Sequence, residues 1–273
     1  MCKRVCVCFF SPCGNVKKIA ERMGKRASEI LGCPLALFDF TLPAGRKSTI
    51  AFGNDDFVIL GVPTYAGRIP NKIAPFVEAS IRANNSKAIA VVSFGNRSYD
   101  DALDELVFLM RKNGFDVVGA TAVVSEHSFA SELATQRPNE EDMTELDSFV
   151  GKVMGKKEIG LALGDLSEIG KTMPEKYYTP LRIDNEPAKF LKAVPVVDQE
   201  KCNHCMKCTF VCPMGSVDLK DPSMTNGICI KCQACIHACP QKARFFDNED
   251  FLSHREMLKK NYGKSRLTSE YFV

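Results

Sequence analysis

Residues 4–16, RVCVCFFSPCGNV, pass from a continuous apolar run directly into a short polar loop. The segment 4–10, which is apolar from Val5 onward, has the length and the character of a strand that is buried on both faces. The loop 11–16 contains glycine and precedes a segment whose apolar residues return at helical spacing from Val16 to Leu31. A strand, a glycine-containing loop and a helix in this order are typical of an α/β fold, in which the helix start can bind a phosphate.

The same alternation of strand-length and helix-length segments continues through residues 1–156. It predicts an α/β fold, with a doubly wound parallel five-stranded sheet and helices on both of its faces. The predicted strands are 4–10, 35–40, 57–62, 88–94 and 116–124, and the predicted helices after the first are 71–83, 99–113 and 139–154.

The composition of the 273-residue chain narrows its class. A net charge of +3 and 25% charged residues favour neither nucleic acid nor an anionic membrane as a partner. The first apolar run ends at Phe10, which is too short for a signal peptide, and no later run reaches the length of a membrane span. We therefore expect a cytoplasmic protein. Of its 13 cysteines, eight lie between Cys202 and Cys239, which favours metal binding over disulfides.

Three loops follow predicted strands at the edge of the sheet where doubly wound folds bind ligands, namely 11–16, 63–70 and 94–101. SPCGNV, VPTYAGRIP and FGNRSYDD in these loops resemble the three flavin loops of flavodoxins. The resemblance covers about residues 1–156 and implies FMN as a cofactor. The implied FMN-binding residues are Ser11, Pro12, Cys13, Gly14, Asn15, Val16, Pro63, Thr64, Tyr65, Ala66, Gly67, Arg68, Phe94, Gly95, Asn96, Arg97, Tyr99 and Asp101.

The first of these loops departs from the flavodoxin pattern, because Cys13 and Val16 stand where hydroxyl residues are favoured. Backbone N–H groups and the helix dipole can still hold a phosphate, so we expect FMN to bind with reduced affinity. An ordinary β–α turn is the alternative. Aromatic residues of the other loops are candidates to stack on the flavin ring, and the two arginines either approach the flavin or are solvated. These residues are Tyr65, Phe94, Tyr99, Arg68 and Arg97.

The eight late cysteines form two copies of one motif, CxxCxxCxxxCP. The first copy begins at Cys202, and the second begins 27 residues later, at Cys229. The segment 195–246 resembles the bacterial ferredoxins that hold two 4Fe-4S clusters. The resemblance implies that Cys202, Cys205, Cys208 and Cys239 bind one cluster and that Cys229, Cys232, Cys235 and Cys212 bind the other. Zinc is the alternative metal, although it favours pairs of CxxC motifs. His204 and His237 are expected to lie beside the ligands.

The whole chain therefore divides into an FMN-binding domain (1–156), a linker (157–194), a two-cluster α+β ferredoxin-like domain (195–247) and a tail (248–273). We expect the tail to pack back on a domain, and a free tail is the alternative. This organisation resembles the flavodoxin–ferredoxin fusions, or iron–sulfur flavoproteins, which are common in anaerobes.

The resemblance implies electron transfer between the clusters and FMN, coupling one-electron carriers to a two-electron flavin. Redox proteins or a small-molecule electron acceptor are the expected partners, and a homodimer is compatible with the sequence. The alternative is an FMN-dependent reductase of a small organic substrate, with segment 125–137 as a roof, His127 as a proton donor and Arg137 as an anion site. A third hypothesis is a scaffold that no longer binds FMN.

Overall fold

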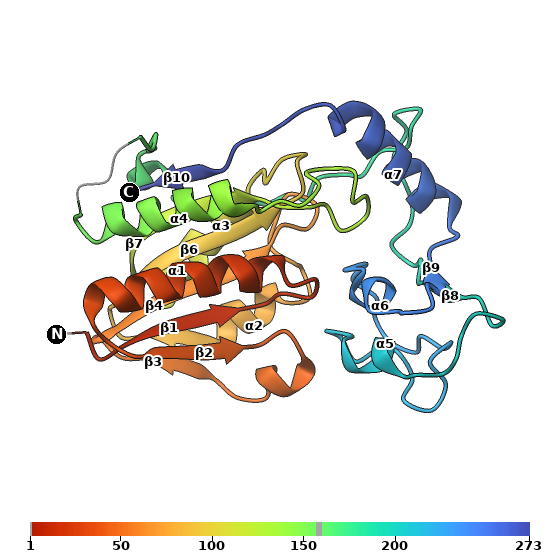
Figure 1. Ribbon diagram of the computed structural model, residues 1–273, viewed down its shortest axis with the longest axis horizontal. Helices are drawn as coiled ribbons and strands as arrows, with labels where there is room; N and C mark the ends of the chain where they lie inside the picture. Colours follow the sequence, from red (N-terminus) through yellow and green to blue (C-terminus); the bar gives the residue numbers. More distant parts are fainter. Residues whose placement is uncertain (1, 157–159) are drawn as a thin grey trace.

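The main sheet of the molecule has six strands in a computed structural model that describes residues 2–156 and 160–273. Its spatial order is β10-β7-β6-β4-β1-β2 (Figure 1). Five strands run parallel, and the sixth, β10, is antiparallel to β7. Their bounds are β1 Arg4–Phe9, β2 Leu35–Asp39, β4 Asp56–Pro63, β6 Ser86–Phe94, β7 Phe115–Val124 and β10 Glu270–Phe272.

The five parallel strands have the order 2-1-3-4-5 of flavodoxin-like doubly wound folds. The order reverses between β1 and β4, so the loops that follow these two strands flank the switch point, where ligands of such folds bind. The predicted α/β fold and its parallel strands are confirmed.

Helices cover both faces of this sheet, and the strand residues alternate between the two cores. Val5, Val7 and Phe9 of β1 point into the core beneath α1 (Asn15–Leu31) and α4 (Glu140–Val153). Cys6 and Cys8 point into the opposite core, beneath α2 (Ala74–Ser80) and α3 (Ala102–Lys112). This alternation follows from the period of two along a strand, and it explains why every residue of the run is apolar.

The predicted alternation of strand and helix is wrong in two places. Between the predicted strands 35–40 and 57–62, residues 43–46 form a 3₁₀ helix and the short strand β3 (Ile50–Phe52) follows it, so no helix alternates with these strands. The predicted helix 71–83 is the shorter α2, and the chain then continues as β5 (Ile81–Ala83), which pairs with β3. Local helical periodicity did not reveal this pairing, because the partner strand lies about thirty residues earlier.

The predicted five-stranded sheet also omitted β10. Tyr271 of β10 is 4% exposed and pairs with Thr121 of β7, and its ring lies 5.2 Å from that of Phe149. The strand has only three residues, too few for a sequence pattern to identify. It covers the edge of β7 that the parallel strands leave open.

The cysteine-rich segment forms a small module beyond the carboxyl ends of the parallel strands (Figure 1). Its helical turns are α5 (Lys207–Phe210) and α6 (Ala234–His237), and its strands β8 (Val196–Val197) and β9 (Arg244–Phe245) pair antiparallel. The helix α7 (Glu249–Tyr262) follows and leads the chain back to β10. No helix within the described ranges is both long and apolar enough to cross a membrane.

Candidate cofactor sites

The two cysteine motifs fold into the same local structure twice. Positions 27 residues apart share the left-handed backbone conformation that L-residues rarely adopt. The pairs are His204 (φ 53°) with Lys231 (57°), Met206 (62°) with Gln233 (68°), and Gly215 (61°) with Lys242 (51°). A left-handed residue before α5 and before α6 turns each loop sharply, and the turn brings neighbouring cysteines to one side.

Backbone N–H groups point at the last cysteine sulfur of each motif. Ser216 N–H donates to Cys212 Sγ and Ala243 N–H donates to Cys239 Sγ, each over 3.3 Å. In the second motif, Lys231 N–H also donates to Cys229 Sγ over 3.4 Å. Such N–H···S contacts stabilise thiolate sulfur, the form that binds metal.

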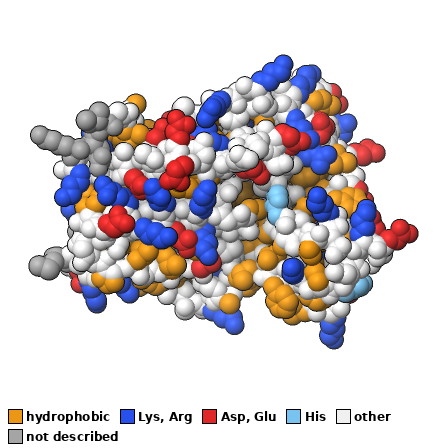
Figure 2. Space-filling model, in the orientation of Figure 1, with side chains coloured by type: hydrophobic (Ala, Val, Ile, Leu, Met, Phe, Trp, Pro, Cys, Tyr) orange, Lys and Arg blue, Asp and Glu red, His pale blue; other side chains and the backbone are white. Residues whose placement is uncertain are grey.

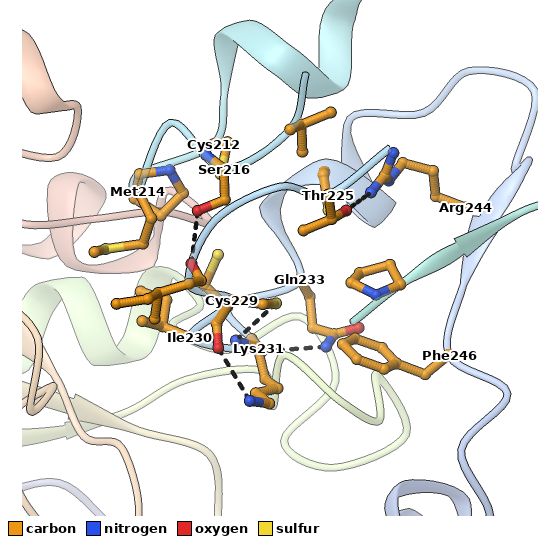
Figure 3. A pocket seen from close by; sticks show the side chains of 16 residues that line it. Cys212, Met214, Ser216, Thr225, Cys229, Ile230, Lys231, Gln233, Arg244 and Phe246 are labelled. Atoms are coloured by element: carbon orange, nitrogen blue, oxygen red, sulfur yellow. Dashed lines mark hydrogen bonds between the residues drawn. The ribbon is translucent and has the colours of Figure 1, made fainter. Parts of the chain in front are cut away.

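Each of two cavities is lined by four cysteines, and each set takes three from one motif and one from the other. The cavity that we call the proximal cavity has a volume of about 390 Å³ (Figure 3). The cavity that we call the distal cavity has a volume of about 330 Å³. The proximal set is Cys212, Cys229, Cys232 and Cys235, and the distal set is Cys202, Cys205, Cys208 and Cys239.

This grouping is the one that the ferredoxin resemblance implies. In the described part of the chain, no three His, Cys, Asp or Glu side chains are arranged around a single metal ion. Four thiols from the two motifs instead line each cavity, and such a set of soft thiolate ligands fits an iron–sulfur cluster. Neither His204 nor His237 lines a cavity, and His237 Nε2 lies 3.2 Å from the Ser128 carbonyl oxygen.

The first predicted FMN loop leads into α1 through a left-handed glycine. Gly14 precedes α1 with φ 91°, and a Cβ placed there would meet no atom within 4 Å, so the loop borders open space. Ser11 Oγ accepts the Lys17 N–H over 2.9 Å and keeps its own proton as a donor. The side chain of Val16 is 2% exposed and packs in the core beneath α1. The Val16 side chain therefore faces the core and not the open side of the loop.

The second loop holds a buried hydroxyl without a partner. Thr64 Oγ1 is buried and has no hydrogen-bond partner among the described residues. An unpaired buried hydroxyl is costly, and in a loop that borders a ligand site it fits a hydrogen bond to that ligand. Together with Gly14, this observation shows that residues of the first two loops suit the FMN that the fold implies.

Other predicted FMN residues hold the loops to the rest of the protein. Arg68 makes two hydrogen bonds of 2.7 Å to Glu105, so it is neither solvated nor free to turn toward a flavin. The Asn96 amide donates to the Tyr262 and Ser265 carbonyl oxygens, over 2.9 and 2.7 Å. Both side chains therefore stabilise loop conformation through contacts distant in sequence.

The third loop is fixed by close packing and by the linker. A Cβ on Gly95 would lie 2.4 Å from the His127 ring, so only glycine fits there. The Arg97 guanidinium pairs with Asp100 and lies 3.9 Å from the centre of the Tyr178 ring. The linker residue Tyr178 also contacts the second loop, because its N–H donates to the Ala66 carbonyl oxygen over 2.8 Å. The linker is thus part of the wall around the predicted flavin loops.

The three aromatic candidates for stacking on the flavin lie in different surroundings. Phe94 is 4% exposed, and its ring lies 5.3 Å from that of Tyr99, whose hydroxyl donates to Glu270 over 2.7 Å. Burial raises the pKa of Tyr65 well above its usual value, and the nearby Cys232, Cys13 and Cys229 raise it further. Tyr65 is therefore the aromatic candidate that faces the cysteine module.

The proximal cavity adjoins the predicted FMN loops directly. Cys13 Sγ of the first loop donates to the Cys232 carbonyl oxygen over 2.8 Å. Arg46 donates to the Pro213 carbonyl oxygen, which fixes the other motif against the sheet domain. Met214 and Ile230 of the cavity wall pack on the core beneath α2 and α3. Local patterns carry no signal for these contacts, because Cys13 and Cys232 are 219 residues apart.

The segment 125–137 supports α7 and the cysteine module instead of standing free. Phe129 packs on Phe251 and His254 of α7, and Arg137 is held by Asp142 in two hydrogen bonds. The Phe129 N–H donates to His127 Nδ1 over 3.1 Å. Burial, His254 and Arg97 lower the pKa of His127 to about 4, so its ring is neutral near pH 7.

Comparisons with known proteins match each half separately. Residues 194–217, which include the first cysteine motif, match a 4Fe-4S binding domain family. An uncharacterised ferredoxin of Methanocaldococcus jannaschii is 29% identical over 106 residues, or 32% of this chain and 65% of that relative. The chain thus spans about 65% of the length of this curated relative.

Solved structures match the first half of the chain at low identity. A flavodoxin from the domain Archaea is 16% identical with a TM-score of 0.41, covering 56% of this chain and 96% of that one. Oxidised Flavodoxin 2 from Bacillus cereus is 17% identical with a TM-score of 0.41, covering 56% and 98%. A Streptococcus pneumoniae flavodoxin is 19% identical with a TM-score of 0.40, covering 55% and 97%.

Proposed function

We propose that this chain, a flavodoxin–ferredoxin fusion, carries electrons between two 4Fe-4S clusters and an FMN, and so couples one-electron carriers to a two-electron flavin. Iron–sulfur clusters pass single electrons, whereas FMN accepts one or two. The observation that carries the proposal is the 2.8 Å hydrogen bond from Cys13, in the first FMN loop, to the carbonyl oxygen of Cys232, a cysteine of the proximal cavity.

The two cavities have different places in this relay. The proximal cysteines adjoin the flavin loops through Cys13 and Tyr65. The distal cavity has exposed lining residues, among them Cys205 and Lys207. We assign the distal cluster to exchange with external carriers and the proximal cluster to exchange with FMN.

Residues of this chain would support electron exchange at the cysteine sets and at FMN. The main-chain N–H groups that point at Cys212, Cys229 and Cys239 stabilise thiolate sulfur. Met214 and Ile230, which line the proximal cavity, pack on the apolar core of the sheet domain. Gly14 and Thr64 leave a backbone cradle and a free hydroxyl for FMN.

A redox protein is the partner that the exposed surface favours. Apolar side chains reach the surface on the half of the molecule that carries the cysteine module (Figure 2). Among them Phe210, which ends α5 beside the distal Cys208, is 70% exposed. An exposed aromatic side chain next to an exposed cluster suits a transient protein contact.

Two residue roles that the reductase alternative requires are not supported by the contacts of these residues. Arg137 is committed to Asp142, so it does not offer an anion site. Segment 125–137 packs on α7, so it is a fixed support and not a closing roof. The carrier hypothesis needs neither feature.

The content of anaerobically purified protein tests the proposal first. Two clusters and one flavin predict about eight irons, about eight acid-labile sulfides and one FMN per chain. Cys232→Ala should keep FMN but slow flavin reduction by a reduced ferredoxin by more than tenfold, while the distal cluster still reduces. Cys33→Ala, at a cysteine outside both cavity sets, is the matched control and should leave flavin reduction at the wild-type rate.

Two results would contradict the relay. FMN reduction at the wild-type rate in Cys232→Ala would show that the proximal cysteines lie outside the electron path. Saturable steady-state reduction of quinones, enones or nitro compounds by the protein would favour the reductase instead.

A further inference from the structure

Arg244 occupies a position where the internal repeat has an apolar residue. The repeat offset of 27 aligns Arg244 with Val217, five residues after the last cysteine of each motif. Both side chains are buried, with exposures of 3% and 4%. The two halves of the module thus share backbone and burial here but differ by one full positive charge.

The guanidinium of Arg244 has no carboxylate to neutralise it. Its Nη2 donates to Thr225 Oγ1 over 3.0 Å (Figure 3), and its Nη1 donates to the Pro222 carbonyl oxygen. Its Nε is buried and has no hydrogen-bond partner among the described residues. None of the ion pairs in the described part of the chain includes Arg244.

Arg244 lines both cysteine cavities. Cys208 and Cys239 line the distal cavity with it, and Cys212 and Cys235 line the proximal one. One buried cation therefore lies in the wall of both cysteine sets.

A buried cation without a counterion is expensive, so its presence requires negative charge close by. Two clusters with thiolate ligands supply that charge, and each one-electron reduction makes a cluster more negative. A fixed cation next to a cluster favours the reduced state over the oxidised one, and net charge and hydrogen bonds to sulfur are among the factors that set cluster potentials.

We propose that Arg244 is a cation shared by the two cluster sites, and that it raises the reduction potentials of both clusters together. The proposal rests on the two-cluster function proposed above. The competing explanation is that Arg244 only anchors the loop of Pro222 and Thr225. That role predicts a change in stability without a change in potential.

The test is an anaerobic redox titration of the full chain, followed by electron paramagnetic resonance at low temperature. Arg244→Met removes the charge and keeps much of the volume, and Arg244→Gln removes it while keeping an amide donor for Pro222. Lys242→Gln is the matched control, because it removes one positive charge two residues away at an exposed position, where solvent screens it.

We expect the one-electron reduction equilibrium of each cluster to weaken by about tenfold in both Arg244 variants, a fall of about 59 mV in each midpoint potential. Lys242→Gln should leave both midpoints unchanged. If Arg244→Met does not load its clusters, the iron content will show this, and Arg244→Gln then decides the question.

Unchanged potentials in a neutral variant that carries all its iron would overturn the proposal, and so would a shift confined to one cluster. Wild-type protein without eight irons would instead refute the two-cluster function, so the two failures are distinguishable.

Discussion

Arg68 and Glu105 show how a predicted ligand-binding residue can have a structural role. Their side chains are 5% and 1% exposed, and Glu105 also accepts the Ile69 N–H over 2.9 Å. The Tyr177 ring lies 4.9 Å from the guanidinium. A buried, hydrogen-bonded pair of this kind fixes the second predicted FMN loop to α3.

Glu105→Gln tests this pair, because it leaves the Arg68 charge buried and unpaired. We expect the free energy of unfolding to fall by about 3–5 kcal/mol in urea titrations. The exposed pair Lys112–Glu78 is the control, and Glu78→Gln should cost less than about 1 kcal/mol. Equal effects of the two substitutions would show that the buried pair does not hold the loop.

His127 gives the protein a predictable dependence on pH. The folded state keeps the ring neutral down to about pH 4, whereas the unfolded chain takes up a proton near the ordinary pKa of 6.5. Between these values the unfolded state binds more protons, so the free energy of unfolding falls as pH is lowered through this window.

His127→Asn should remove this part of the pH dependence. From pH 7.5 to pH 5.5 the histidine accounts for a loss of about 1 kcal/mol in wild type. Thermal unfolding of both proteins at the two pH values measures the difference. An identical pH dependence in the variant would mean that His127 is not held neutral by the fold.

At the scale of elements, the structure differs from the sequence prediction where a short segment pairs with a distant one. The helices α1, α3 and α4 follow long amphipathic patterns, and all three were predicted. The strands β3, β5 and β10 have three residues each. Their partners determine their conformation, so local periodicity carries no signal for them.

Tyr271 is the residue through which β10 should stabilise the sheet. Tyr271→Ala removes a ring that packs on Phe149 and a hydroxyl that donates to Glu145 over 3.0 Å. We expect a loss of about 3 kcal/mol in the free energy of unfolding, as for other buried aromatic truncations. Val273→Ala, at a position that is 40% exposed, is the control and should change stability little. Comparable losses at both positions would contradict a specific role for the Tyr271 contact.

At the scale of the whole molecule, the cysteine module meets the sheet domain without an ion pair among the described residues. The contacts between them are the hydrogen bonds from Cys13 and Arg46 to carbonyl oxygens, the approach of His237 to Ser128, and the packing of Met214 and Ile230. Contacts that contain no salt bridge are little affected by salt.

In the proposed relay, the rate of electron transfer from the proximal cluster to FMN should therefore stay within about twofold between 50 and 500 mM salt. Flash reduction of the holoprotein, followed at flavin wavelengths, measures this rate. A steep fall with salt would show that charges hold the two modules together, against the contacts described here.

The sequence by itself determined the α/β fold of the first half and the chemistry of the second. Both depend on local patterns: unbroken apolar strands, amphipathic helices, and thiols at fixed spacing. The 27-residue repeat even singles out Arg244 against Val217, although it does not show what the guanidinium contacts.

Only the tertiary structure decided which cysteine set adjoins the flavin loops, and that Arg68 and Asn96 support those loops. It also decided that β10 completes the sheet and that one cation lines both cavities. The physical reason is the same in each case. These features arise from contacts between residues far apart in the chain, and the packing of the finished fold selects such contacts, not the pattern of neighbouring residues.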